Sequence, residues 1–287
     1  MENILELKNV TKEYKKFKID NISFSLPKGY IMGFIGQNGA GKTTTIKLIM
    51  NLVKRNSGEI KVFGKDNLQY EKEIKEKIGF VYDDCFYYDF FTLEDNAKIL
   101  STFYKEWSFD KFYKYLDLFG LNKKQKLKEL SKGMKMKFSL SLALSHNAEF
   151  IIMDEPTAGL DPVVRTELLD ILRETIQNEN VGILLSTHIT SDLEKIADYI
   201  TFIDNGKIVF SKTKDKVFED YVIVKGEKEL LTKENEKYFI GMSKNRFGFE
   251  GLIENTKEAK ESFADNVLYE RPTLEQIMIF QSKKNKR

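Results

Sequence analysis

The chain has few of the features that mark secreted or membrane-spanning proteins. Its 287 residues include one cysteine, Cys85, so no disulfide can form within the chain and a reducing compartment is expected. No stretch approaches the roughly 20 consecutive apolar residues that a membrane helix needs. The chain starts Met1-Glu2-Asn3 without an apolar run, which argues against a signal peptide. If the protein works at a membrane, another chain is expected to supply the membrane-spanning part.

The chain also lacks a large excess of either charge. Its 46 Lys and Arg residues nearly balance 44 Asp and Glu residues, for a net charge of +2. A protein that mainly neutralises a phosphate backbone carries a clear excess of positive charge, so we do not expect nucleic acid as a partner. The length suffices for one large domain and one small domain, each with a core of its own.

One stretch forms a complete phosphate loop with the pattern G-x-x-x-x-G-K-[ST]. The apolar run 30–35 predicts a buried strand entering it, and residues 44–53 predict a helix leaving it. The glycines let backbone N–H groups point at a polyphosphate, and the helix N-terminus adds a positive dipole end. Lys42 is expected to reach the β- and γ-phosphates, and the Thr43 hydroxyl to ligate Mg²⁺. The loop reads Gly36-Gln37-Asn38-Gly39-Ala40-Gly41-Lys42-Thr43.

Three short segments around this loop predict a small antiparallel sheet surrounding the phosphate-loop strand. They span residues 3–8, 18–25 and 60–63. Tyr14 lies between the first two, and its ring could stack on an adenine. The alternative is that Tyr14 is a packing or turn residue.

The next part of the chain predicts a buried strand over 79–82, which ends at Asp83-Asp84. An unusually aromatic segment, 85–91, follows, and its side chains either form an exposed docking patch or fill the core of the neighbouring helices. Helices are expected from Thr92, an N-cap, to about Leu118, with a break near Ser108. The lysine-rich stretch 122–128 is interpreted as a solvated loop, with a nucleic-acid patch as the less favoured alternative.

A second acidic pair ends another buried strand. The run 150–153 leads into Asp154-Glu155, and carboxylates at the end of a parallel strand facing a phosphate loop are placed for Mg²⁺ and water chemistry. A long helix is predicted over 134–146, and another over 163–178 with Asp161 as its N-cap and Pro162 at its first position. The buried strand 181–186 is followed at once by Thr187-His188.

The alternation of strands and helices predicts a parallel-sheet α/β domain over residues 1–216, with a helical subdomain over about 90–147. A hairpin is expected at Asn205-Gly206. Residues 217–287 read as a separate small α+β domain that ends in a helix with a capping box at Thr273. The basic tail 283–287 is a solubilising terminus or a contact for anionic lipid.

Taken together, these motifs make residues 3–215 resemble the ATP-binding subunits of ABC transporters. The resemblance rests on the phosphate loop, on the signature segment 130–134 (Leu-Ser-Lys-Gly-Met), on the Walker B strand 151–155, on Gly159-Leu160-Asp161 as the D-loop and on His188 as the switch histidine. It implies a P-loop NTPase fold, with a RecA-like parallel core, an antiparallel β subdomain and a helical subdomain.

The resemblance also implies roles for individual residues. Two such domains would close head to tail on two ATP molecules, each lying between the phosphate loop of one subunit and Ser131 and Gly133 of the other. Asp154 would hold Mg²⁺, Glu155 would deprotonate the attacking water, and His188 would contact the γ-phosphate. Lys42, Glu155 and His188 form the expected catalytic set, and Thr43, Asp83 and Asp154 the metal set. The expected nucleotide contacts are Tyr14, Gly36, Asn38, Gly39, Ala40, Gly41, Lys42, Thr43, Thr44, Ser131, Gly133 and Asp161.

Two departures from the family pattern concern the signature and the Q-loop. The usual signature is Leu-Ser-Gly-Gly-Gln, whereas here Lys132 and Met134 replace the first Gly and the Gln. Ser131 and Gly133 remain, so the contact with the opposite nucleotide is expected to survive. Asp83, with Asp84 as the alternative, stands for the Q-loop glutamine. A carboxylate can offer an oxygen to Mg²⁺ but donates no hydrogen bond.

The domain after residue 216 resembles the ABC-2 type, exporter-like branch. A motor that energises a separate permease at the cytoplasmic face of the membrane is therefore expected, paired with a second copy or a related subunit, for export of a drug-like, peptide or other amphipathic compound. One alternative is a soluble ABC-type ATPase acting on ribosomes or nucleic acid, although the stretch between Thr43 and Ser131 is too short for the coiled coil of DNA-repair members. Another is a regulatory module that hydrolyses little, against which the presence of Glu155 argues.

Overall fold

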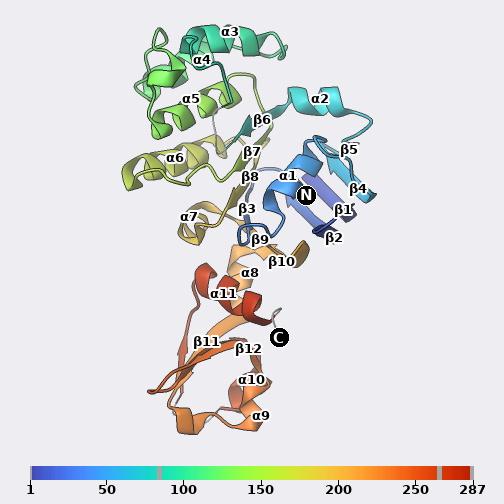
Figure 1. Cartoon of the computed structure of the whole chain (residues 1–287), viewed down its shortest axis with the longest axis vertical. Helices are drawn as coiled ribbons and strands as arrows, with labels where there is room; N and C mark the ends of the chain where they lie inside the picture. Colours follow the sequence, from blue (N-terminus) through green and yellow to red (C-terminus); the bar gives the residue numbers. More distant parts are fainter. Residues whose placement is uncertain (1, 83–85, 264–266, 285–287) are drawn as a thin grey trace.

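The computed structural model describes residues 2–82, 86–263 and 267–284. Figure 1 shows a helical subdomain, a central sheet region and a C-terminal domain following one another along the long axis. Asp83 and Asp84, the candidates for the Q-loop position, lie outside the described residues, as do residues 285–287 of the basic tail.

A six-stranded sheet forms the centre of the molecule, in the order β10-β9-β3-β8-β7-β6. Neighbouring strands from β9 to β6 are parallel, and β10 pairs antiparallel with β9. Strands β3, β7 and β8 are buried along their whole length, which explains their continuous apolar runs. The bounds are β3 (Ile31–Ile35), β6 (Ile78–Val81), β7 (Phe150–Asp154), β8 (Gly182–Thr187), β9 (Tyr199–Asp204) and β10 (Lys207–Thr213).

A separate antiparallel sheet, β2-β1-β4-β5, covers one face of this core. The expectation that it surrounds the phosphate-loop strand is wrong in one respect: β3 belongs to the parallel sheet, between β9 and β8. The sheets meet by packing, and Phe24 of β2 stacks on Phe34 of β3 with ring centroids 5.5 Å apart. The bounds are β1 (Asn3–Glu13), β2 (Lys18–Pro27), β4 (Ser57–Val62) and β5 (Lys65–Asp66).

Helices pack on both faces of the parallel sheet. The core cluster under the antiparallel sheet includes residues of α1, and the cluster on the other face includes residues of α5, α6 and α7. This confirms the predicted P-loop fold, with its parallel core and antiparallel subdomain. The bounds are α1 (Lys42–Ile49), α2 (Glu71–Glu76), α6 (Pro162–Thr175) and α7 (Thr190–Ile196).

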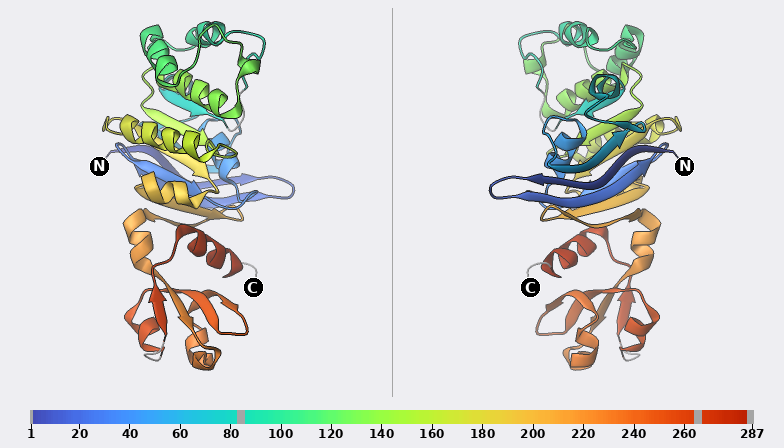
Figure 2. Two further views of the ribbon diagram at one scale, coloured as in Figure 1. Left: turned by 90° about the vertical axis from the view of Figure 1, so that its left-hand side faces the viewer. Right: turned by 90° about the vertical axis from the view of Figure 1, so that its right-hand side faces the viewer.

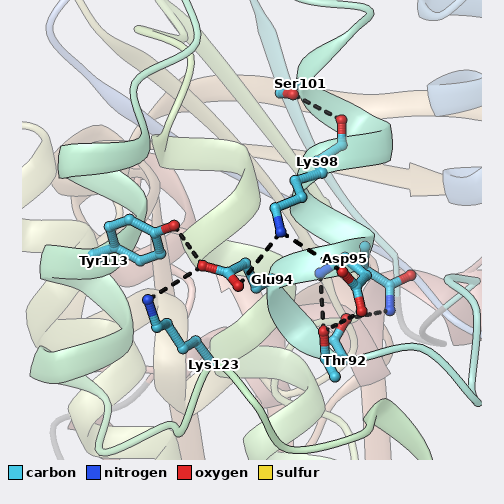
Figure 3. A network of polar contacts seen from close by, with 8 residues as sticks. Thr92, Glu94, Asp95, Lys98, Ser101, Tyr113 and Lys123 are labelled. Atoms are coloured by element: carbon cyan, nitrogen blue, oxygen red, sulfur yellow. Dashed lines mark hydrogen bonds and ion pairs between the residues drawn. The ribbon is translucent and has the colours of Figure 1, made fainter.

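The helical subdomain contains α3 (Leu93–Ser101), α4 (Phe109–Leu118), the 3₁₀ turn η1 (Leu127–Glu129) and α5 (Lys132–Leu144). Ser108 caps α4, as the predicted break requires. In Figure 3, Glu94 of α3 accepts from the Tyr113 hydroxyl of α4 at 2.6 Å and meets Lys123 at 3.2 Å. The Tyr113 hydrogen bond and the Lys123 ammonium lower the pKa of Glu94 to about 2. This network joins two helices and the lysine-rich loop.

The C-terminal domain is built on an antiparallel sheet in the order β12-β13-β11-β14. Buried residues of α11 share the main core with α7, whereas Ala259 and Phe263 pack on the other side of the sheet. Figure 2 shows this domain joined to the central region through α8 and α11. Its elements are α8 (Lys214–Asp220), β11 (Tyr221–Gly226), η2 (Lys228–Leu230), α9 (Lys233–Glu236), β12 (Phe239–Lys244), β13 (Phe249–Glu254), α10 (Lys257–Glu261), β14 (Leu268–Glu270) and α11 (Leu274–Lys284).

Candidate active site

The phosphate loop joins the end of β3 to the start of α1. Helix α1 begins at Lys42, so the loop lysine lies in the first helical turn. Its side chain is 6% exposed, and Nζ donates to the Gly36 carbonyl at 2.8 Å. Gly41 has φ +117, and a Cβ there would lie 2.5 Å from Ile19 Cδ1. Only glycine can adopt this backbone conformation and also leave room for Ile19, which explains why the phosphate loop has glycine at position 41.

A cavity of about 540 Å³ opens at this loop. Because a helix N-terminus and a lysine both face it, the cavity is electrostatically suited to a polyphosphate. Gly36 and Ala40 are buried beside it. The lining residues are Phe17, Gln37, Asn38, Gly39, Gly41, Lys42, Thr43, Thr44 and Glu155.

Phe17, rather than Tyr14, is the aromatic residue that lines this cavity. Its Cζ lies 3.1 Å from the position that a Cβ of Gly41 would take. The Tyr14 ring is 46% exposed and lies 5.3 Å from the Lys12 ammonium, while its N–H donates to the Phe17 carbonyl at 2.8 Å. Both residues belong to the β1–β2 turn. The sequence therefore indicated an aromatic ring near the phosphate loop but did not show which of the two rings faces it. Stacking of Tyr14 on an adenine stays a prediction.

The two carboxylates at the end of β7 have different surroundings. Asp154 is 6% exposed and accepts from the Ser186 hydroxyl of β8 at 2.8 Å. Glu155 has φ +51, an uncommon conformation for a residue with a side chain, and its N–H donates to the Ser186 carbonyl at 2.9 Å. Ser186 therefore positions both residues. Ser186 was not among the site residues predicted from the sequence, although it lies two positions before His188.

Glu155 joins the phosphate loop to the switch histidine. Its Oε1 lies 3.1 Å from Lys42 Nζ, and its Oε2 lies 2.7 Å from His188 Nδ1. The His188 backbone N–H donates to the same Oε2 at 3.2 Å. The structure thus brings the three predicted catalytic residues together, although they lie far apart in the sequence. A carboxylate next to an imidazole is an arrangement that can accept and pass on a proton.

The residues predicted to hold Mg²⁺ supply suitable oxygen donors. The Thr43 hydroxyl lies at the exposed N-terminus of α1, and Asp154 supplies a buried carboxylate. Among the described residues, no group of three or more His, Cys, Asp or Glu side chains could hold a metal ion. Mg²⁺ is commonly held by one or two protein oxygens together with phosphates and water, so this donor set fits it. Burial raises the pKa of Tyr82, and the negative charge of Asp154 raises it further. Tyr82 directly precedes Asp83, which lies outside the described residues.

The signature residues lie at the start of α5. Ser131 is exposed and caps the helix, with Oγ accepting from the Met134 N–H at 3.3 Å. This cap starts α5 at Lys132, two residues before the predicted start. Asp161 caps α6 through the Val163 and Val164 N–H groups at 3.0 and 3.1 Å. Within the described chain, Ser131, Gly133 and Asp161 lie outside the lining of the phosphate-loop cavity.

The aromatic segment is divided between surface and core. Phe86 and Phe90 are each 73% exposed. Tyr87 packs against the buried Phe138 of α5, with ring centroids 5.7 Å apart. The segment therefore combines the two alternatives of the sequence analysis.

The chain is similar to proteins of known sequence and structure. Within the described residues, no helix has both the length and the apolar character to cross a bilayer. The family model for "ABC transporter" matches residues 19–158. The bacitracin transport ATP-binding protein BcrA of Bacillus licheniformis is 34% identical over 216 residues, 73% of this chain and 69% of that protein. The lantibiotic transport ATP-binding protein SrtF of Streptococcus pyogenes is 34% identical over 215 residues, 74% of this chain and 92% of that protein. The linearmycin resistance ATP-binding protein LnrL of Bacillus subtilis is 34% identical over 217 residues, 74% of this chain and 70% of that protein.

Solved structures agree with these relatives. An ATP-binding subunit of an ABC transporter superposes with a TM-score of 0.69 at 28% identity and covers 75% of this chain and 91% of its own. A nucleotide-free ATP-binding cassette from an ABC transporter gives a TM-score of 0.65 at 26% identity, with coverage of 75% and 93%. Together with the motifs and the geometry above, these matches show that the chain belongs to the ABC transporter family, as an ATP-binding subunit that hydrolyses ATP to drive transport.

Proposed function

We propose that this chain is the motor of an exporter, and that it energises a separate permease from the cytoplasmic face of the membrane. The cargo class is a drug-like, peptide or other amphipathic compound. Support comes from relatives whose names refer to bacitracin, a lantibiotic and linearmycin. The observation that carries the catalytic part is the direct contact of Glu155 with both Lys42 and His188.

The phosphate loop binds the nucleotide in this proposal. Backbone N–H groups of the loop and of the first turn of α1 surround the phosphates. Lys42 exchanges its contact with Glu155 for the β- and γ-phosphates, which frees the carboxylate. Thr43 and Asp154 would hold Mg²⁺, which would neutralise charge on the phosphates.

Glu155 then acts as the general base toward water. His188 holds the carboxylate in place through Nδ1 and presents its other ring nitrogen toward the γ-phosphate. General-base catalysis of this kind typically contributes ~10²–10⁴-fold to the rate. The left-handed backbone of Glu155 is consistent with a functional constraint at this position.

A second ATP-binding subunit completes the site. The exposed position of Ser131, away from the phosphate-loop cavity of its own chain, supports a contact with the nucleotide of another subunit. Ser131 supplies a hydroxyl, Gly133 an N–H, and Asp161 lies at the same interface. The exposed rings of Phe86 and Phe90 form the contact with the permease, since exposed aromatic side chains are typical of protein interfaces.

The substitution Glu155→Gln tests the general-base role. It keeps the size of the side chain and removes its basicity, so we expect ATPase turnover to fall by about 10²–10⁴-fold while ATP stays bound and holds a closed dimer. Steady-state ATPase assays and size-exclusion chromatography with ATP measure both effects. Glu149→Gln, which alters a surface pair with Lys77, is the control. Unchanged turnover in Glu155→Gln would falsify the general-base role.

A further inference from the structure

Helix α7 connects the switch histidine to the rest of the molecule. It starts at Thr190, two residues after His188. On one side α6 holds it: Arg165 Nε lies 2.6 Å from Oδ1 of the fully buried Asp192, and Arg173 donates to the Lys195 carbonyl at 3.3 Å. His188 lies between the end of β8 at Thr187 and the start of α7, so a shift of α7 would act on it directly.

The other side of α7 is held by the C-terminal domain. Oε1 of the half-buried Glu194 accepts from the backbone N–H of Leu274 at 2.8 Å, across 80 positions of sequence. Leu274 is the first residue of α11, where backbone N–H groups lack a partner within the helix. A carboxylate at this end is also favoured by the helix dipole. The Glu194 carbonyl accepts from Lys214 Nζ of α8 at 3.0 Å, so one residue joins α7 to two helices of the C-terminal region.

Helix α11 is itself fixed closely on the C-terminal sheet. A Cβ at Gly241 of β12 would lie 2.4 Å from the Phe280 carbonyl oxygen of α11. Leu274, Ile277 and Phe280 are buried in the same core cluster as Leu193 and Ile196 of α7. A displacement of the sheet would therefore move α11, and α11 would pull on Glu194.

We propose that Glu194 is a positioning residue for ATP hydrolysis, through which the C-terminal domain holds α7, and with it His188, against Glu155. Glu194 is not among the described residues that line the phosphate-loop cavity, so it acts through α7. The domain thereby sets the rate of hydrolysis without altering the phosphate loop. The inference rests on the proposed role of His188.

The test compares steady-state MgATP hydrolysis by the full-length chain and four variants. Glu194→Ala is expected to lower kcat on the order of 3–10-fold with an unchanged KM for ATP, because the phosphate loop is untouched. Glu194→Gln keeps an oxygen that accepts from Leu274 and is expected to retain the wild-type kcat. Glu270→Ala breaks an ion pair with Lys225 inside the C-terminal domain and serves as the control for general loosening. His188→Ala measures the full contribution of the switch histidine.

A further variant displaces α11 without changing Glu194. Gly241→Ala places a methyl group against the Phe280 carbonyl, and we expect it to lower kcat in the same way as Glu194→Ala. If both variants keep the wild-type kcat while His188→Ala loses it, the inference is overturned and the proposed function stands. A parallel rise in KM, or an equal loss in Glu194→Gln, would also overturn it. An unchanged kcat in His188→Ala would refute the proposed role of the histidine, and the inference with it.

Discussion

The phosphate-loop half and the signature half of the proposed two-subunit nucleotide site use the same structural element in opposite environments. Each places a helix N-terminus where phosphate can be bound: α1 begins Lys42-Thr43-Thr44 and α5 begins Lys132-Gly133-Met134. The first lies in a cavity, with a lysine that has a carbonyl and a carboxylate as partners. The second is exposed, and the Ser131 hydroxyl serves the cap of its own helix.

The difference indicates which steps a single chain can carry out by itself. The phosphate loop is assembled by β3, α1 and β7 of the same sheet region, so nucleotide binding is expected of a single subunit. The start of α5 contributes nothing to that cavity. In the proposed two-subunit site, the start of α5 therefore contacts the nucleotide of a second molecule.

The largest expected effect separates the two halves directly. Lys42→Ala removes charge-assisted contacts worth about 1.5–3 kcal/mol, so ATP affinity should fall roughly 10–150-fold. Ser131→Ala should leave the ATP affinity of the monomer unchanged and lower turnover only. Calorimetric titration with ATP in the absence of Mg²⁺ and ATPase assays measure these outcomes. Ser108→Ala removes an equivalent cap from α4 and controls for cap loss. Equal loss of affinity in the Lys42 and Ser131 variants would abolish the distinction.

An intermediate effect concerns the aromatic segment beside the helical subdomain. Replacing the exposed Phe86 and Phe90 by Ala should abolish transport in a reconstituted complex, spare ATP binding and change stability by less than about 0.5 kcal/mol. Tyr87→Ala, which removes a ring packed on Phe138, should instead cost about 1–3 kcal/mol of stability. Thermal unfolding and transport assays distinguish the two. Normal transport by the double variant would argue against permease docking at these rings.

The smallest expected effect concerns the stability of the helical subdomain, which carries the signature half. The folded-state pKa of Glu94 is about 2, below its ordinary value of 4.5, so its stabilising contribution is present above pH 4.5 and is lost as the pH falls toward 2. The melting temperature of the wild type should therefore fall more steeply over this range than that of Glu94→Gln. Identical pH dependence of the two proteins would show that the network in Figure 3 adds nothing to stability.

The sequence predicted those features whose physical cause is local. The phosphate loop, the capped helices and the Asn205-Gly206 hairpin each depend on a few neighbouring residues, and β9 and β10 pair as expected. The sheet to which β3 belongs was not predictable in the same way. A fully buried apolar run shows that a strand is covered on both faces but not which strands lie beside it.

The remaining parts of the site depend on contacts between distant segments. The bond from Ser186 to Asp154 spans 32 positions, and that from Leu274 to Glu194 spans 80. No local pattern marks either one. That Phe17 rather than Tyr14 lines the cavity has a different cause, because the geometry of the β1–β2 turn decides which ring faces the loop.

The ion pair between Lys42 and Glu155 gives an arriving anion a contact to replace. The Lys42 ammonium already has a carboxylate 3.1 Å away and a carbonyl 2.8 Å away, so any anion that binds there must replace contacts that the protein makes by itself. Inorganic phosphate or sulfate is small and meets few N–H groups of the loop. A nucleotide triphosphate extends along the loop and meets several N–H groups at once. The contact with Glu155 therefore weighs more against a small anion than against a triphosphate, which has more phosphate oxygens to offer the loop.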